Sequence, residues 1–159
     1  MLDFKKTYEL IKKQSYLQNF NLIKDDGKEL VIKSMLDYGV FESICEIHVT
    51  YYGQVTVVFT LGKFDKKMDN KKYQDLELDY RWVQNRYYDS HNGVFMFTSL
   101  MHNGEKYLAL KYNDINYIRD NTTPEKVRRV VDIALKWATD SDLSGYITQM
   151  GMALKNKKR

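Results

Sequence analysis

The chain has a single cysteine, Cys45, and a single proline, Pro124, among its 159 residues. One cysteine cannot form an intramolecular disulfide, and it excludes zinc sites built from several cysteines. One proline and eight glycines exclude collagen-like repeats and proline- or glycine-rich disorder. The three histidines lack the HxH or HExxH spacing of metal sites. We therefore expect neither a metal nor a cofactor.

Motifs for catalysis are missing as well. The chain has no G-x-x-x-x-G-K for phosphates and no G-x-G-x-x-G for a dinucleotide. Cys45 and His48 would point to opposite faces of a strand, so Cys45 is predicted to be a buried apolar residue and not a nucleophile. Residues 89–91 (Asp-Ser-His) favour a polar loop over a hydrolytic triad. The acids of residues 65–79 alternate with lysines, which favours a solvated face over a magnesium site. The sequence predicts a non-enzymatic protein.

Long apolar runs are absent too. The longest, such as residues 55–61, fall far short of the roughly 20 residues that cross a bilayer. Residues 1–6 lack the apolar stretch of a signal peptide. With 43% hydrophobic and 29% charged residues, the composition is that of a globular domain. We expect a cytoplasmic protein without membrane association.

The net charge of +4 belongs to the C-terminal tail. Residues 155–159 hold four basic residues and no acidic one, so residues 1–154 sum to zero. No Pro/Gly/Ser-rich linker divides the chain, and no segment repeats. The sequence therefore predicts a single domain over residues 1–154, followed by a flexible basic tail.

The patterns of apolar residues predict an α+β fold. Apolar side chains at three- and four-residue spacing predict an amphipathic helix over residues 4–13. Alternation, with turns at glycines, then predicts a series of strands. These are expected around residues 19–25, 29–35, 40–52 and 54–61. Broken alternation near Cys45 indicates either a bulge or burial on both faces.

The second half of the chain predicts a hairpin between helices. Asn103-Gly104 joins two apolar-rich runs, and this dipeptide favours a turn with positive φ at both residues. Thr123-Pro124-Glu125 marks the start of a core helix, and a short helix is expected from Leu143 to Leu154. Residues 73–88 favour a helix, although their alternation also fits a strand. The whole predicts an antiparallel sheet of about five to six strands with helices packed on it.

Aromatic residues offer the best clue to function. Thirteen tyrosines accompany only seven phenylalanines, and tyrosine is favoured where a surface is half apolar and half wet. Residues 80–88 also mix aromatic and basic side chains, as single-stranded nucleic acid binding requires, although on a helix Tyr80, Val83 and Tyr87 would face the core. The candidate interaction surface consists of Tyr51, Tyr52, Arg81, Trp82, Arg86, Tyr87, Tyr88 and Tyr112.

The order of elements resembles the type III secretion chaperone-like fold, and within it the YbjN-type domains of bacterial sensory-transduction regulators. The resemblance rests on the opening helix at residues 4–13, the turn Asp26-Gly27-Lys28-Glu29, the stretch from Trp82 to Arg86, and the helix start Thr123-Pro124-Glu125-Lys126-Val127. Residues 62–72 depart from it as an insertion. It implies a non-enzymatic, often dimeric module whose sheet or helical groove holds a partner polypeptide, and it implies no catalytic residue.

We therefore expect an adaptor, chaperone-like or regulatory, that binds a protein partner or forms a homodimer. The alternative is a nucleic-acid-associated protein, for example of a phage, that uses residues 80–88 and the basic tail on phosphates. No small-molecule ligand is expected.

Overall fold

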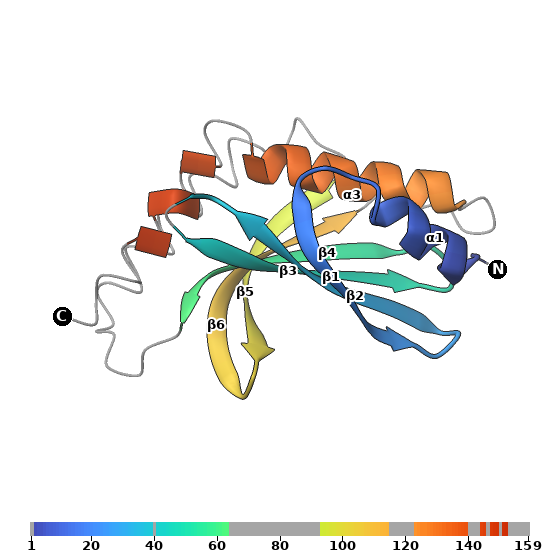
Figure 1. The fold of residues 1–159 in the computed structure, drawn as a ribbon, viewed down its shortest axis with the longest axis horizontal. Helices are drawn as coiled ribbons and strands as arrows, with labels where there is room; N and C mark the ends of the chain where they lie inside the picture. Colours follow the sequence, from blue (N-terminus) through green and yellow to red (C-terminus); the bar gives the residue numbers. More distant parts are fainter. Residues whose placement is uncertain are drawn as a thin grey trace.

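The computed structural model describes residues 2–39, 41–63, 93–114, 123–139, 144–145, 147–149 and 151–152. The elements are α1 (Phe4–Ile11), β1 (Leu17–Asp25), β2 (Glu29–Asp37), β3 (Glu42–Thr50), β4 (Val55–Lys63), β5 (Gly93–His102), β6 (Glu105–Asp114) and α3 (Pro124–Thr139). The strands form one antiparallel sheet in the order β1-β2-β3-β4-β6-β5. Helices α1 and α3 lie together on one face of it (Figure 1). This is the α+β fold that the sequence predicted.

The hairpin turn and the helix start that the sequence predicted are both present in the structure. Asn103 and Gly104 have φ angles of 50° and 77°, and β5 and β6 pair on either side of them. This is the two-residue turn whose twist matches that of the strands. At the start of α3, the Thr123 hydroxyl oxygen accepts from the Lys126 amide at 3.3 Å, and Pro124 occupies the first helical position.

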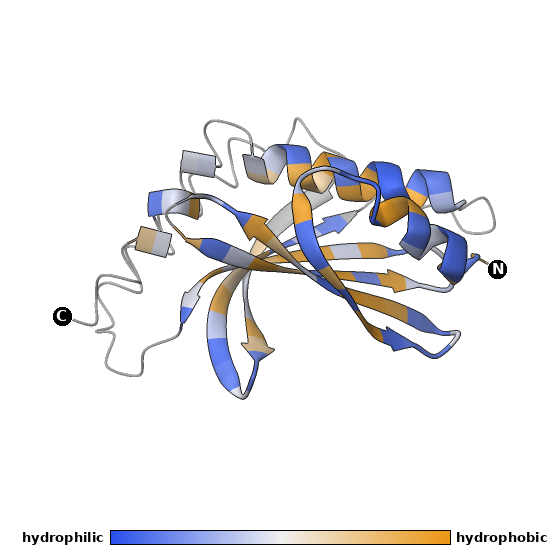
Figure 2. Ribbon diagram, in the orientation of Figure 1, coloured by the Kyte–Doolittle hydropathy of each residue, from blue (hydrophilic) through white to orange (hydrophobic). Residues whose placement is uncertain are grey.

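One face of the sheet, here the covered face, packs against α1 and α3. Alternate residues of the strands supply its side chains; Cys45, Ile47 and Val49 of β3 are fully buried there. The apolar stripe of α3 meets them with Val127, Val131, Ala134, Leu135 and Ala138. Figure 2 shows apolar residues along the side of α3 that faces the sheet. Burial of these side chains is the main source of stability.

Near Cys45 the broken alternation comes from burial on both faces of β3. Ser43, Ile44 and Cys45 are all buried, although side chains alternate between the faces. The register of β2 with β3 runs without interruption from Glu29↔Thr50 to Asp37↔Glu42, so no bulge lies in this pairing. Bulges lie instead in β1 and β4, where the pairing register shifts.

The C-terminal residues extend the helical layer. Residues 144–145, 147–149 and 151–152 are helical, in agreement with the predicted final helix. Ile147 is fully buried and joins the core. No helix within the described residues is long and apolar enough to span a bilayer. The helix expected over residues 73–88 and the basic tail lie outside the described residues.

Candidate binding groove on the open face of the sheet

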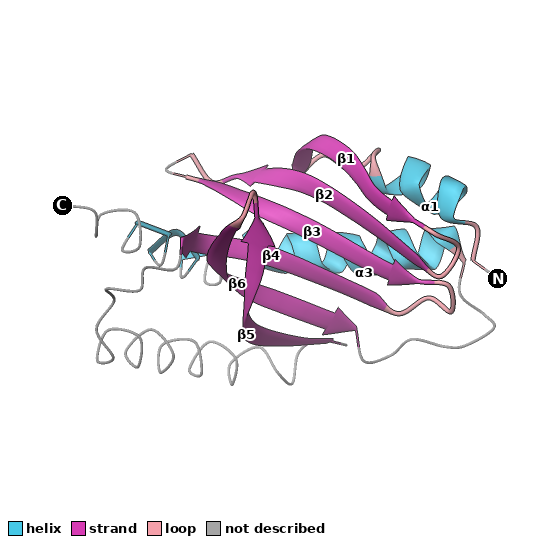
Figure 3. Cartoon of the chain, turned by 90° about the horizontal axis from the view of Figure 1, so that it is seen from below, coloured by secondary structure: helices cyan, strands magenta, loops and turns pink. Residues whose placement is uncertain are grey.

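The second face of the sheet, here the open face, is covered by neither α1 nor α3 (Figure 3). The sheet curls across this face. Lys33 on β2 places its Nζ 3.1 Å from Nδ1 of His102 at the end of β5, although β3, β4 and β6 lie between these strands. The curl brings the β5–β6 hairpin over the open face and so creates a concave surface.

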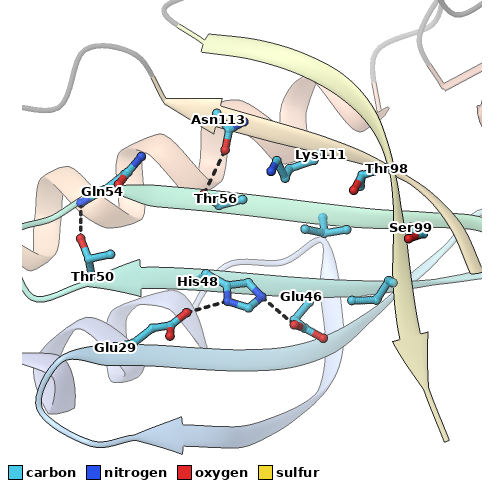
Figure 4. Close-up of a pocket in the computed structure, with 12 residues that line it drawn as sticks. Glu29, Glu46, His48, Thr50, Gln54, Thr56, Thr98, Ser99, Lys111 and Asn113 are labelled. Atoms are coloured by element: carbon cyan, nitrogen blue, oxygen red, sulfur yellow. Dashed lines mark hydrogen bonds and ion pairs between the residues drawn. The ribbon is translucent and has the colours of Figure 1, made fainter. Parts of the chain in front are cut away.

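A groove of about 510 Å³ lies in this concave surface (Figure 4). Four ionisable residues line it within the described part of the chain, namely Glu29, Glu46, His48 and Lys111. Hydroxyl and amide side chains form most of the remainder, namely Thr50, Gln54, Thr56, Thr98, Ser99 and Asn113. Of the described residues that line it, only Val58 and Leu100 are apolar. The groove is therefore lined mainly by groups that form hydrogen bonds.

His48 lies at one side of the groove between two carboxylates. Its Nδ1 is 2.8 Å from Oε1 of Glu29, and its Nε2 is 2.6 Å from Oε1 of Glu46. A carboxylate only accepts, so both ring nitrogens donate and the imidazole carries a positive charge. The hydrogen bond to Glu46, assisted by that to Glu29, raises the pKa of His48 against the opposing effect of burial.

Each of the two carboxylates also contacts a lysine. Lys24 Nζ lies 3.3 Å from Oε2 of Glu29, and Lys33 Nζ lies 3.6 Å from Oε2 of Glu46. The hydrogen bond from His48 lowers the pKa of Glu29. Burial alone would raise the pKa of Glu46, but the hydrogen bond from His48 and the charge of Lys33 hold it below its usual range. These five residues, here the His48 cluster, are mutually paired.

The His48 cluster is poorly suited to proton transfer or metal binding. Both nitrogens of His48 are occupied by carboxylates, so neither has a free lone pair. Within the described ranges, no group of three or more His, Cys, Asp or Glu side chains is arranged to hold a metal ion. Cys45 is fully buried on the covered face, and burial raises the pKa of its thiol, as expected for an inert cysteine.

Lys111 of β6 forms the opposite wall of the groove. It is half-buried, and its register partners are Val58 on β4 and Met96 on β5. Beside it, the Thr56 hydroxyl donates to Oδ1 of Asn113 at 3.1 Å. In contrast to Glu29, Glu46 and His48, the Lys111 ammonium has no ion pair or hydrogen bond with any residue that the structure describes.

Of the predicted interaction residues, two lie at the surface near this groove. Tyr51 is 45% exposed and stacks edge-on against Tyr52 in the turn between β3 and β4. The Tyr52 hydroxyl donates to Oε1 of Gln54, a residue that lines the groove, at 3.3 Å. These two tyrosines thus flank one end of the groove.

Tyr112 corrects the expectation of an exposed tyrosine patch. It is 1% exposed and belongs to the core, because its parity on β6 is opposite to that of Lys111 and Asn113. It therefore does not contribute to a surface. The other predicted residues, Arg81, Trp82, Arg86, Tyr87 and Tyr88, lie outside the described residues.

The sequence patterns did not identify the charged residues of the groove, Glu29, Glu46, His48 and Lys111, as a site. The sequence nevertheless contains a signal for them. In β3, apolar Cys45, Ile47 and Val49 alternate with polar Glu46, His48 and Thr50. In β6, Lys111 and Asn113 alternate in the same way with buried neighbours. When every second residue of two central strands is polar, these residues are expected to lie on one face of the sheet that no helix covers.

Comparison with known proteins adds no match: no family model, curated protein or solved structure is significantly similar to this chain. The resemblance to YbjN-type domains thus stays a prediction, and the function is inferred from the groove itself.

Proposed function

We propose that this protein is a non-enzymatic binding module, in an adaptor, chaperone-like or regulatory role, whose groove holds an extended segment of a partner polypeptide. The observation that carries the proposal is the lining of the groove, whose described residues are mostly ones with hydroxyl, amide or charged side chains and include two apolar ones. Pockets for small molecules and cofactors are lined predominantly by apolar and aromatic groups. A polypeptide backbone instead offers one donor and one acceptor for nearly every residue.

The hydroxyl and amide side chains of the groove suit such a backbone. Threonine and serine hydroxyls donate and accept, and the amides of Gln54 and Asn113 do both through separate atoms. The side-chain hydroxyl of Thr98, which shares the parity of the open face, has no hydrogen bond with any residue in the described ranges and is therefore available to a ligand. The distance from β2 across β3 and β4 to β6 is about 14 Å, and a segment of about four extended residues would span it.

The state of the ionisable groups supports binding over catalysis. The imidazolium of His48 is held between two carboxylates, and the only cysteine is buried. A general base needs a nitrogen free to accept a proton, and a nucleophilic cysteine needs an accessible thiolate. The described residues of the groove thus provide fixed charges and hydrogen bonds, and none of them is poised as a reacting group.

Selection of short, unstructured peptides from a displayed library against the full chain tests the proposal. A selected peptide is titrated into the wild type and into two variants of equal charge change, Thr98→Arg in the groove and Thr139→Arg on α3. We expect Thr98→Arg to weaken binding about tenfold or more, because its side chain fills the groove, and Thr139→Arg to leave it unchanged. Binding that is insensitive to Thr98→Arg would refute the proposal. Light scattering shows whether a second copy of this chain supplies the segment.

A second candidate is nucleic-acid association, and one observation favours it. Four exposed basic side chains, Lys5 on α1, Lys13 in the turn after it, and Arg129 and Lys136 on α3, form no ion pair with any other described residue. Such side chains attract phosphates in a salt-dependent manner. If they bind nucleic acid, an electrophoretic shift at low salt should disappear in Arg129→Glu and persist in Thr98→Arg. No shift of DNA or RNA at low salt would exclude this candidate.

A further inference from the structure

The charged side chains that line the groove differ in whether they have an oppositely charged partner. His48 lies 2.8 Å from Glu29 and 2.6 Å from Glu46, and Lys24 and Lys33 provide each carboxylate with a second cationic partner. Each carboxylate therefore already has two cationic partners. Lys111 lines the same groove but has no such partner within the described residues. Among the described lining residues, Lys111 carries the charge that is left for a ligand to neutralise.

The sheet register keeps Lys111 apart from the carboxylates. Glu46 pairs with Val58, and Val58 pairs with Lys111, so β4 lies between the two charged residues. Two strand spacings, about 9.5 Å, separate the two backbones, and no ion pair joins Lys111 to Glu46 or Glu29 in the structure. Val58 is 6% exposed and lies on the floor between them. Lys111 thus faces the groove without a carboxylate of its own.

Neighbouring groups around Lys111 can assist in the binding of an anion. Thr98 of β5 is the diagonal neighbour of Lys111 in the pairing of these strands, and its hydroxyl can donate. Asn113 lies two residues further along β6, and its Nδ2 makes only a long contact, 3.6 Å, with Met96 Sδ. Figure 4 shows Lys111 between these two side chains in the groove. An ammonium, a hydroxyl and an amide NH2 group can each donate a hydrogen bond to a carboxylate.

We propose that the polypeptide segment held in the groove is acidic, and that one of its carboxylates pairs with Lys111. This inference rests on the proposed function of the groove and specifies the chemistry of the partner. A basic segment would bring its charges beside Lys111 and find Glu29 and Glu46 already paired. Unfavourable charge contacts of this kind discriminate between partners as effectively as favourable ones.

The test uses two labelled pools of unstructured peptides that are equal in length. They differ only in that one carries Asp and Glu where the other carries Asn and Gln. Each pool is titrated into the folded full chain and into Lys111→Gln, Lys111→Arg and Lys136→Gln. We expect the wild type to bind the acidic pool about tenfold more tightly, because a charge-assisted hydrogen bond is lost with the neutral pool. Lys111→Gln should remove this preference, whereas Lys111→Arg and Lys136→Gln should retain it.

The outcomes separate this inference from the proposed function. If both pools bind equally and Thr98→Arg weakens both, the groove binds polypeptide and only the acidic preference is wrong. If Lys111→Gln keeps the preference, the carboxylate is bound elsewhere and the role of Lys111 is refuted. If neither pool binds, or if Thr98→Arg has no effect on the binding of the neutral pool, which cannot form an ion pair with the new arginine, the proposed function fails and the inference fails with it.

Discussion

The covered and open faces of the sheet come from alternate residues of the same strands, yet they differ in what they hold. In β3, Cys45, Ile47 and Val49 are fully buried under the helices. Their neighbours Glu46 and His48 point the other way, with 13% and 32% of their side chains exposed. The open face tolerates these charges because they pair with one another, since an unpaired charge at this depth would be costly.

The two faces of the sheet also depend on each other through the register of the strands. The register of β2 with β3 places Ile32 opposite Ile47 and, one step further, Val31 opposite His48. A slip by one residue would exchange the faces, because side chains alternate along a strand. Apolar burial on the covered face therefore fixes the register, and the register in turn places Glu29 and Glu46 around His48.

The largest expected loss of stability comes from a substitution on the covered face. Ile47→Ala removes a fully buried side chain between β2 and β4, and such deletions cost about 2–5 kcal/mol of unfolding free energy. Thr56→Ala, on the open face, removes one hydrogen bond to Asn113 and should cost about 1 kcal/mol or less. Urea unfolding followed by circular dichroism measures both. Equal losses would show that the open face is as important to stability as the core.

A smaller effect is expected at the far end of the helical layer. A Cβ at Gly151 would overlap the ring of Phe41, which stacks on Tyr38 at a centroid distance of 5.2 Å. The Tyr38 hydroxyl donates to the carbonyl of Ala138 at 2.9 Å, so the ring pair is tied to α3. Gly151→Ala should therefore destabilise the protein by about 1–3 kcal/mol in urea unfolding.

Gly145→Ala is the matched control, because a Cβ at this helical glycine meets no atom within 4 Å. It should leave stability unchanged or raise it by up to about 1 kcal/mol through helix propensity. Losses of similar size at both positions would contradict the close packing of Phe41 on Gly151.

Local features of the fold could be predicted from the sequence because local chemistry determines them. The Asn103-Gly104 turn, the Thr123-Pro124 helix start and the burial of Cys45 all follow from residues close to one another in the chain. Alternation also separates the two parities of each strand. It does not say which parity the helices cover, and for this reason Tyr112 was expected at the surface although it lies in the core.

The groove could not be predicted, because its parts are distant in sequence. Lys33 meets His102 across 69 positions, and His48 meets Glu29 across 19. The first contact depends on the curl of the sheet and on the pairing of β4 with β6, which leaves β5 at the edge. The second depends on the register of β2 with β3. Long-range pairing of this kind is set by the packing of the whole sheet, and no short motif records it.

The smallest expected effect concerns the open face and depends on pH. The pKa of His48 is raised by Glu46 and Glu29, so its stabilising contribution is complete below about pH 6.5, the ordinary histidine pKa, and is lost as the pH rises through the folded-state value. The pKa values of Glu29 and Glu46 are lowered, so their contributions are present above about pH 4.3 and are lost as the pH falls. The cluster is thus fully charged between these limits.

A double-mutant cycle of His48→Gln and Glu46→Gln isolates this contribution from the rest of the protein. The coupling free energy should be about 1 kcal/mol near pH 6, as expected for a partly exposed, charge-assisted hydrogen bond. It should fall toward zero well above the raised pKa of His48, because the imidazole is then neutral in both the folded and the unfolded chain. Urea unfolding of the four proteins across this range provides the values. A coupling that does not change with pH would mean that His48 is held by packing and carries no charge, and the open face would then lack the paired charges that distinguish it from the covered one.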